Sequence, residues 1–143
     1  SGAMVYGANF SIGVNLFYRI VAEAASLFAA VDGYAAFIEE AHHSRKRDAP
    51  SGTALKLREL MSEHLGPDIS TASTRAGHIP GTHRVGFDSE ADQILLTHTA
   101  RSRQGFASGA IVAAHWIAGR TGVFEFGHVI DEIIATKRQK AQK

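Results

Sequence analysis

The sequence lacks cysteine altogether, and this absence removes several kinds of chemistry at once. Disulfide bonds, thiolate metal ligands and a cysteine nucleophile are all excluded. No run approaches the roughly 20 apolar residues that a membrane-spanning helix requires. The first residues also lack the basic, apolar and cleavage regions of a secretory signal. We therefore predict a cytoplasmic protein with no membrane partner.

The chain also has little net charge, because 15 lysine and arginine residues face 14 aspartate and glutamate residues. No overall field then draws the chain to nucleic acid or to an anionic surface. A short basic cluster at Arg45 to Arg47 lacks the interleaved aromatic residues of a single-strand binding platform. We predict no nucleic-acid partner, so any anion must be bound by a local group of residues.

The length of 143 residues, of which 45% are hydrophobic, fits one globular domain. The opening Ser1-Gly2-Ala3, ahead of Met4, resembles the remnant of a cleaved tag, and we set it aside from the fold. We assign residues 4–143 to the domain and leave open whether the native chain begins earlier. The printed residues contain no Gly-x-Gly-x-x-Gly run of the kind that cradles a dinucleotide pyrophosphate.

Apolar residues recur at helical spacing in three segments. They predict a long helix from Ser11, its N-cap, to about Val31. Shorter helices are predicted over 54–65, where the stop signal Gly66-Pro67 follows, and over 106–118.

Segments of strand-like composition lie between these helices. Residues 34–41 predict one strand, and residues 85–87 and 94–99 predict two more, joined as an antiparallel hairpin. Helices interleaved with such strands favour an α+β fold, in which helices pack on a mixed, largely antiparallel sheet. The basic tail over 137–143 is expected to be frayed.

The segment over residues 40–54 leads from the first strand into the second helix, and its composition indicates an anion-binding site. It carries adjacent histidines, a run of cations and the start of a helix: His42, His43, Arg45, Lys46, Arg47, Ser51, Gly52 and Thr53. Unpaired N–H groups and the helix dipole favour a negative charge at such a start. Gly52 lets a ligand approach the backbone, and the Ser51 and Thr53 hydroxyls add donors. A mobile ammonium and a histidine that titrates near neutrality could add proton transfer to carboxylate binding.

The same residues have a purely structural explanation, which the pattern alone leaves open. Ser51 can be only an N-cap, the basic run only a solvated loop, and His42 and His43 only exposed polar residues. No metal site is predicted, because sequence cannot show the three or four converging ligands that zinc requires. Further histidines are expected to have structural or surface roles: His64, His115 and His128.

The segment from Glu40 to Ala54 resembles the signature of the dihydrodipicolinate reductases. That signature is Glu, any residue, His-His, two residues, Lys, one residue, then Asp-Ala-Pro-Ser-Gly-Thr-Ala, and every fixed position is matched. Three more segments resemble the same family: Ala8 to Asn15 at the opening of its substrate domain, Arg75 to His83 in its strand region, and Thr97 to Ala110 in its last strand and following helix. The resemblance therefore covers nearly the whole chain. His83 and His98 match family positions without a role that we can assign from the sequence.

The resemblance implies an activity and a set of site residues. In the family, a nicotinamide hydride reduces a small cyclic dicarboxylate, hydroxy-tetrahydrodipicolinate, with loss of water, on the route to diaminopimelate and lysine. By motif position, His42 would be a proton donor or acceptor at the ring, and Lys46 a proton donor that also attracts a carboxylate. Substrate binding would fall to the remaining matched residues: His43, Ser51, Gly52, Thr53 and Arg103.

The resemblance also implies a cofactor and an assembly. Gly7, Ala8, Asn9 and Phe10 match a hinge-side strand near the nicotinamide, and would form one edge of a site for NADPH or NADH. Because the glycine-rich fingerprint is absent from the printed residues, we expect neither cofactor to bind tightly and the isolated chain to be inactive. A homotetramer formed through the sheets is implied. The alternative is a non-catalytic module for dicarboxylate binding or oligomerisation.

Overall fold

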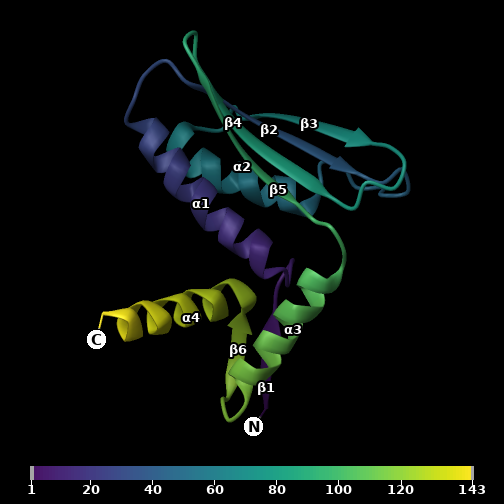
Figure 1. The fold of residues 1–143 in the computed structure, drawn as a ribbon, viewed down its shortest axis with the longest axis vertical. Coiled ribbons are helices and arrows are strands. Elements are labelled where there is room, and N and C mark those ends of the chain that lie inside the picture. The colour runs from purple at the N-terminus through teal and green to yellow at the C-terminus, as the bar shows by residue number, and fades with distance from the viewer. Residues whose placement is uncertain (1, 143) are drawn as a thin grey trace. The chain divides into compact units, whose positions relative to one another are not determined.

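The computed structural model describes residues 2–142, which form two compact units (Figure 1). The sheet unit comprises Leu16–Ser102, and the terminal unit comprises the chain up to Asn15 together with the residues from Arg103 onward. The elements follow in the order β1(Ala3–Tyr6), α1(Ile12–Ala29), β2(Ala35–His42), α2(Gly52–Leu65), β3(Ser70–Arg75), β4(Thr82–Asp88), β5(Gln93–Thr99), α3(Gln104–Ile117), β6(Gly122–Glu125) and α4(Phe126–Ala141). Helix α1 therefore begins in the terminal unit and continues into the sheet unit.

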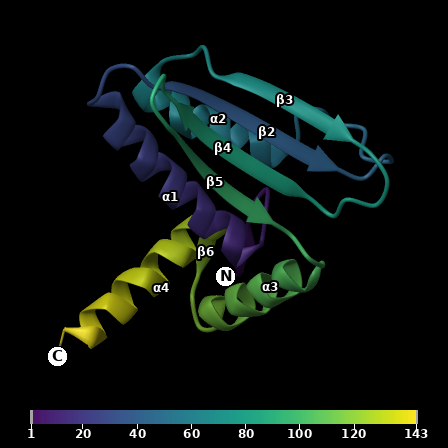
Figure 2. The same ribbon diagram turned by 45° about the horizontal axis from the view of Figure 1, so that its top comes forward.

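A four-stranded sheet in the order β3-β2-β4-β5 forms the frame of the sheet unit. Strand β2 pairs in parallel with β3 and antiparallel with β4, which in turn pairs antiparallel with β5. Helices α1 and α2 lie on one face of this sheet (Figures 1 and 2). Among the described residues of this unit, the other face carries no helix. The predicted α+β class and the mixed, largely antiparallel sheet are confirmed.

The core of the sheet unit follows from the two periodicities of its elements. Helix α1 buries Phe17, Val21 and Ala25 at intervals of one helical turn. Alternate strand residues and one side of α2 complete the core: Ile38, Ala54, Leu57, Met61, Ile69, Val85 and Phe87. Burial of each large apolar side chain contributes about 1.5–3 kcal/mol. This core fixes β2 and the start of α2, which bracket the segment over residues 40–54.

Helix α1 is the one helix of the described residues that is long and apolar enough to cross a membrane, judged by length and composition alone. Its mean hydropathy is 1.3, and 28% of it is buried. The core helix of a soluble protein passes the same test. Since Phe17, Val21 and Ala25 pack into the core of the sheet unit, the finding is weak evidence for a membrane span.

The terminal unit is built on a two-stranded sheet in which β1 and β6 pair in parallel. The ring of Phe10 lies 4.8 Å from that of Phe126. A Cβ added at Gly109 of α3 would lie 1.7 Å from the carbonyl oxygen of Phe10, so only glycine allows α3 to pack against this segment. The buried residues of this core come from α3 and α4: Ala113, Phe126, Val129 and Ile130.

The structure bears on both ends of the chain. Ala3, which was set aside with the tag-like residues, is the first residue of β1 and pairs with Gly122, whereas Ser1 lies outside the described residues; the tag-like origin of these residues stays a prediction. The tail expected to be frayed is helical as far as Ala141. Basic side chains in its last turn interact favourably with the negative end of the helix dipole, and they include Arg138 and Lys140.

Candidate active site

Glu40 and His42 lie near the end of β2 and point toward the face of the sheet that the helices cover. Side chains two residues apart on a strand share a face, and Ile38, two residues earlier, belongs to the core. Glu40 retains 3% of its exposure and His42 retains 9%. His42 Nδ1 pairs with Glu40 Oε2. A buried carboxylate needs such partners, because removing it from water is costly.

Arg75 provides the second partner of this carboxylate. It lies beside His42 in the parallel register of β2 and β3. Its Nη2 donates to Glu40 Oε1 at 2.7 Å and to the backbone carbonyl of Asp48 at 2.6 Å. The N–H of Ser51 donates to the same Glu40 oxygen at 3.2 Å. The Glu40 carboxylate thus joins β2 to β3 and to the start of α2.

His83 of β4 extends this polar network. It stands opposite Glu40 in the antiparallel register and retains 5% of its exposure. Its Nε2 lies 3.1 Å from Ser51 Oγ, and that oxygen accepts the N–H of Ala54 at 3.2 Å as the N-cap of α2. The rings of His42 and His83 meet edge to face, with centroids 5.1 Å apart.

The environment of Glu40 keeps its carboxylate ionised. Burial alone raises the pKa, but hydrogen bonds from Arg75 and Ser73 oppose that effect. Together with His42 and the Ser51 N–H, they lower the pKa of Glu40 to about 2. Glu40 therefore presents acceptors only, and each group that faces it must donate.

The two histidines of the network are neutral at pH 7. Burial lowers the pKa of His42, although the attraction of Glu40 opposes this shift. Burial also lowers the pKa of His83, to about 4, with a contribution from the nearby His42. A neutral imidazole offers one donor nitrogen and one acceptor nitrogen, so each ring can take part in proton exchange.

The basic loop after β2 is folded back on itself. The Lys46 N–H donates to the carbonyl of His43 at 3.1 Å, which forms a turn. Lys46 Nζ lies 2.9 Å from Asp48 Oδ1, and the lysine side chain retains 26% of its exposure. The hydrogen bond from Lys46 lowers the pKa of the exposed Asp48 carboxyl. The ammonium is thus held at the surface by an exposed partner that it can exchange for a ligand anion.

The start of α2 is open on its outer side. A Cβ added at Gly52 would meet no atom within 4 Å, so a ligand can approach the backbone there. The side chain of Thr53 is hydrogen-bonded to the Tyr18 hydroxyl, a contact that the sequence did not indicate. Because a hydroxyl both donates and accepts, this contact does not prevent Thr53 from binding a carboxylate.

The remaining predicted site residues belong to the terminal unit. Arg103 is exposed and immediately precedes α3, where its carbonyl accepts the N–H of Phe106 at 3.1 Å. The expected strand over Gly7, Ala8, Asn9 and Phe10 is not formed, because β1 ends at Tyr6; their place at the edge of a cofactor site stays a prediction. The side-chain oxygen of Asn9 accepts the N–H of Ser11 at 2.8 Å, and such a turn leads the chain into α1 rather than along a strand.

Sequence reasoning assigned no role to Glu40, Arg75 or His83, although all three lie in the network around His42. One signal was available for Glu40, since its spacing of two residues from His42 in a predicted strand places both on one face. Arg75 and His83 come from other strands, and only the register of the sheet brings them here.

A potential metal-ligand atom is offered by each of Glu40, His42 and His83, and these three atoms lie within 4.8 Å of one another. The Arg75 guanidinium already occupies the Glu40 carboxylate at 2.7 Å, and its positive charge opposes a cation at the same group. The contacts favour an internal hydrogen-bonded network over a cation site.

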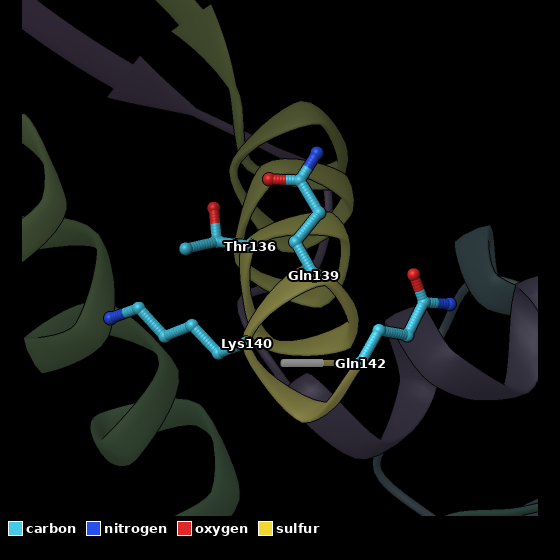
Figure 3. Close-up of a pocket in the computed structure, with 4 residues that line it drawn as sticks. All are labelled: Thr136, Gln139, Lys140 and Gln142. Atoms are coloured by element: carbon cyan, nitrogen blue, oxygen red, sulfur yellow. The ribbon is translucent and has the colours of Figure 1, made fainter.

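The hollows at the surface of the described residues include two that can be compared with the predicted site. Figure 3 shows one of about 490 Å³ on α4, lined by Thr136, Gln139, Lys140 and Gln142, and none of the predicted site residues lines it. The other, of about 430 Å³, lies along β2, β3 and β4 and includes Glu39, Glu40 and Arg84 in its lining. Only the second adjoins the polar network.

Comparisons with known proteins identify the family of the chain. Residues 13–130 match the protein-family model described as "Dihydrodipicolinate reductase, C-terminus". The chain is 38% identical over 143 residues to the 4-hydroxy-tetrahydrodipicolinate reductase of Christiangramia forsetii, across 92% of this chain and 60% of that protein. It is 39% identical over 142 residues to the enzyme of the same name from Methanosarcina mazei, across 88% of this chain and 53% of that protein.

A solved structure is also similar, namely the dipicolinate-bound dihydrodipicolinate reductase from Paenisporosarcina sp. TG-14. It matches with a TM-score of 0.70 and 25% sequence identity, over 85% of this chain and 52% of that one. The chain thus spans a little over half the length of these relatives. It belongs to the dihydrodipicolinate reductase family and corresponds to the C-terminal part of its members.

Proposed function

We propose that the chain is the substrate-binding and catalytic part of a 4-hydroxy-tetrahydrodipicolinate reductase, an oxidoreductase of diaminopimelate and lysine biosynthesis. The observation that carries this proposal is the buried Glu40–His42 pair, joined through Ser51 to the start of α2. A histidine that can exchange a proton thus lies in one network with a helix start that favours anions. The relatives bear the name of this enzyme.

The substrate is a small cyclic dicarboxylate, and the chain offers groups for both of its carboxylates. At the start of α2, the backbone N–H groups of Gly52 and Thr53 and the Thr53 hydroxyl can hold one of them, with His43 and Lys46 beside them. Ser51 supports this helix start from within, because its N–H donates to Glu40 and its hydroxyl contacts His83. The guanidinium of Arg103 suits the other carboxylate, because its planar fork can bind two oxygens at once. The dipicolinate in the solved relative is a planar molecule of this class.

The reduction adds a hydride and a proton to the ring and releases water. NADPH or NADH supplies the hydride when it is bound, but the printed residues lack a glycine-rich pyrophosphate grip. The connection over 7–10 can form only one edge of that site. The residues of this chain therefore contribute binding, orientation and proton transfer, with His42 as donor or acceptor and Lys46 as donor.

The proposal includes a homotetramer in the cytoplasm. The assembly is supported by the face of the sheet that lies opposite α1 and α2. Leu96 packs against the core, so Leu95 points to the opposite face, where it is 46% exposed. Arg84 and Glu39 lie 3.7 Å apart on that same face. A face with an apolar residue beside paired charges suits contact with a second copy of the sheet.

Calorimetric titration with pyridine-2,6-dicarboxylate tests the dicarboxylate site. The wild-type chain is expected to bind it, and Lys46→Ala and Thr53→Ala are expected to weaken binding. Loss of one hydrogen bond to a charged group costs about 1.5–3 kcal/mol, so Lys46→Ala should raise the dissociation constant at least about tenfold.

The matched control is Arg47→Ala, which removes the same charge one residue away from an exposed side chain. It should change the affinity little, because the site requires a directed ammonium rather than general positive charge. No binding by a folded wild-type chain, or equal effects of the Lys46 and Arg47 variants, would contradict the proposal.

A further inference from the structure

The carboxylate of Glu40 has a defined partner on each oxygen. Oε1 accepts from Arg75 Nη2 at 2.7 Å and from the Ser51 N–H at 3.2 Å. Oε2 faces His42 Nδ1. The Glu40 side chain has 0% exposure, whereas that of His42 retains 11%. Within this pair, only the histidine reaches the surface.

These contacts determine which nitrogen of His42 carries the proton. An ionised carboxylate only accepts, so the nitrogen that faces it must be N–H. Neutral His42 therefore carries its proton on Nδ1 and presents Nε2 as an acceptor. A Cβ added at Gly81 would lie 3.3 Å from His42 Nε2, so a glycine at this position leaves that edge of the ring free of a side chain.

We infer that Glu40 is a positioning residue for His42, fixing the tautomer in which Nε2 accepts a proton, and that Arg75 holds Glu40 in place for this task. The inference rests on the proposed function, because it gives His42 a direction in the proton transfer. In its neutral form His42 accepts a proton at Nε2, which leaves Lys46 as the donor.

A purely structural role for the Glu40–Arg75 pair would use the carboxylate differently. Arg75 alone could satisfy both oxygens through the two-pronged geometry that arginine and carboxylate usually adopt. Instead, Arg75 contacts one oxygen through Nη2, which also donates to the Asp48 carbonyl, while its Nη1 donates to the Thr74 carbonyl at 2.8 Å. The second oxygen is left for His42, and this division of contacts indicates a link directed at the histidine.

Glu40→Gln gives a sharp test, because its amide has only one acceptor end. Arg75 and the Ser51 N–H both donate at the Oε1 position, so the amide oxygen must take that place. The amide NH₂ would then face His42 Nδ1 and force it to accept. The proton of neutral His42 should move to Nε2, and the pKa of His42 should fall further because the attraction of a negative charge is lost.

The charged and titratable groups that face His42 come from each surrounding element. Glu40 belongs to the same strand, Arg75 to β3, His83 to β4 and Lys46 to the loop. Of these, Glu40 attracts a proton to His42, and Arg75 and Lys46 repel it. His83 is neutral above about pH 4, so its own charge does not enter the comparison near neutral pH.

¹⁵N NMR of the chain carrying ¹⁵N-labelled histidine reports the tautomer directly. The His42 signals are assigned because they disappear in the His42→Gln variant. Wild type and Glu40→Asp, which keeps the charge, should show Nδ1 protonated and Nε2 free near neutral pH. Glu40→Gln should show the reverse, with a lower His42 pKa in a pH titration. Circular dichroism checks that each variant is folded.

The wild-type spectrum alone can overturn the inference, since a proton on Nε2 of neutral His42 excludes it even where a variant fails to fold. A folded Glu40→Gln chain with unchanged tautomer and pKa would overturn it too, and would leave Glu40 a structural residue. Titration with pyridine-2,6-dicarboxylate reports separately on the proposed function. Nδ1 protonation without ligand binding would count against the proposed function and not against the Glu40–His42 link.

Discussion

Ser51 Oγ lies 3.1 Å from His83 Nε2, and the same oxygen accepts the N–H of Ala54 at 3.2 Å. Since the oxygen already accepts from the helix, its own hydrogen is free to point at the histidine. His83 is neutral near pH 7 because its pKa is about 4, so Nε2 can accept that hydrogen. The N-cap of α2 is thereby fixed to β4, and the helix start proposed to hold a carboxylate is tied to the sheet.

We expect Ser51→Ala to destabilise the chain by about 1.5–5 kcal/mol, since loss of an N-cap costs about 0.5–2 kcal/mol and an unsatisfied buried polar atom about 1–3 kcal/mol. Urea denaturation monitored by circular dichroism measures this. Ser26→Ala, an exposed substitution within α1, is the control and should change stability by less than about 0.5 kcal/mol. Equal effects of the two variants would show that the Ser51–His83 contact contributes nothing.

Stability should fall in two stages as the solution is acidified. His83 has a folded pKa of about 4 against an ordinary 6.5, so the unfolded chain takes up that proton first. The contribution of neutral His83 to stability is complete above pH 6.5 and is lost as the pH falls toward 4. The Glu40 carboxyl has a folded pKa of about 2 against an ordinary 4.5. It contributes fully to the stability of the fold above pH 4.5, and this contribution is lost as the pH falls toward 2.

Urea denaturation across the range from about pH 8 to about pH 3 would resolve these stages. His83→Gln keeps a hydrogen-bonding group at the position but removes its titration, so the first stage should shrink while the second remains. A wild-type stability that stays flat between pH 7 and pH 4 would contradict the buried, neutral state of His83.

The long elements of the fold were predictable because their patterns repeat over several turns. Helix α1 places an apolar residue on one face at each turn, and the signature segment marks the start of α2. Strand β3 reads Ser-Thr-Ala-Ser-Thr-Arg and contains no large apolar residue. It forms because β2 offers a parallel partner, which no local pattern reveals. Strands β1 and β6, of four residues each, depend on each other in the same way.

Helix α4 was missed for a different reason. Its apolar positions Val129, Ile130, Ile133 and Ile134 have helical spacing, but Gly127 near its start and the basic residues near its end weakened the pattern. Tertiary packing of Val129 and Ile130 into the core of the terminal unit decides the structure here.

The sequence predicted the contents of the candidate site better than its connections. The sequence placed His42 and Lys46 in one loop region, whereas His42 is the last residue of β2 and Lys46 lies in the loop that follows; Ser51 is the N-cap of α2, as one reading of the sequence had it. The contact of Ser51 with His83 depends on where β4 lies in the sheet. Register determines which side chains lie opposite each other on neighbouring strands. The whole buried face of the sheet decides the register, rather than any single segment.

The close approach of α3 to the chain before α1 predicts a strong effect of one added methyl group. Gly109→Ala would place a Cβ 1.7 Å from the Phe10 carbonyl oxygen, and because that neighbour is backbone it cannot turn aside. We expect destabilisation of at least about 1–3 kcal/mol, the usual cost of an overpacked core. The single tryptophan, Trp116, lies in α3 and reports on this unit by fluorescence.

Gly105→Ala is the matched control, one helical turn earlier on α3. Its added Cβ would lie 3.6 Å from Ser11 Oγ, an ordinary contact. Because alanine favours a helix over glycine by about 1 kcal/mol, this variant should be as stable as wild type or more so. A Gly109→Ala chain as stable as the Gly105→Ala chain would show that α3 does not pack against Phe10.

The final prediction concerns turnover by the isolated chain. Hydride transfer requires the nicotinamide to be held against the ring, and positioning of this kind supplies several kcal/mol of the barrier reduction. The printed residues include the proposed dicarboxylate site but no glycine-rich grip for the nucleotide. We therefore expect the chain to bind pyridine-2,6-dicarboxylate without oxidising NADPH or NADH when the substrate is supplied. Nicotinamide absorbance followed over time measures this, and steady oxidation in proportion to chain concentration, abolished by His42→Gln, would show that the chain alone holds its cofactor.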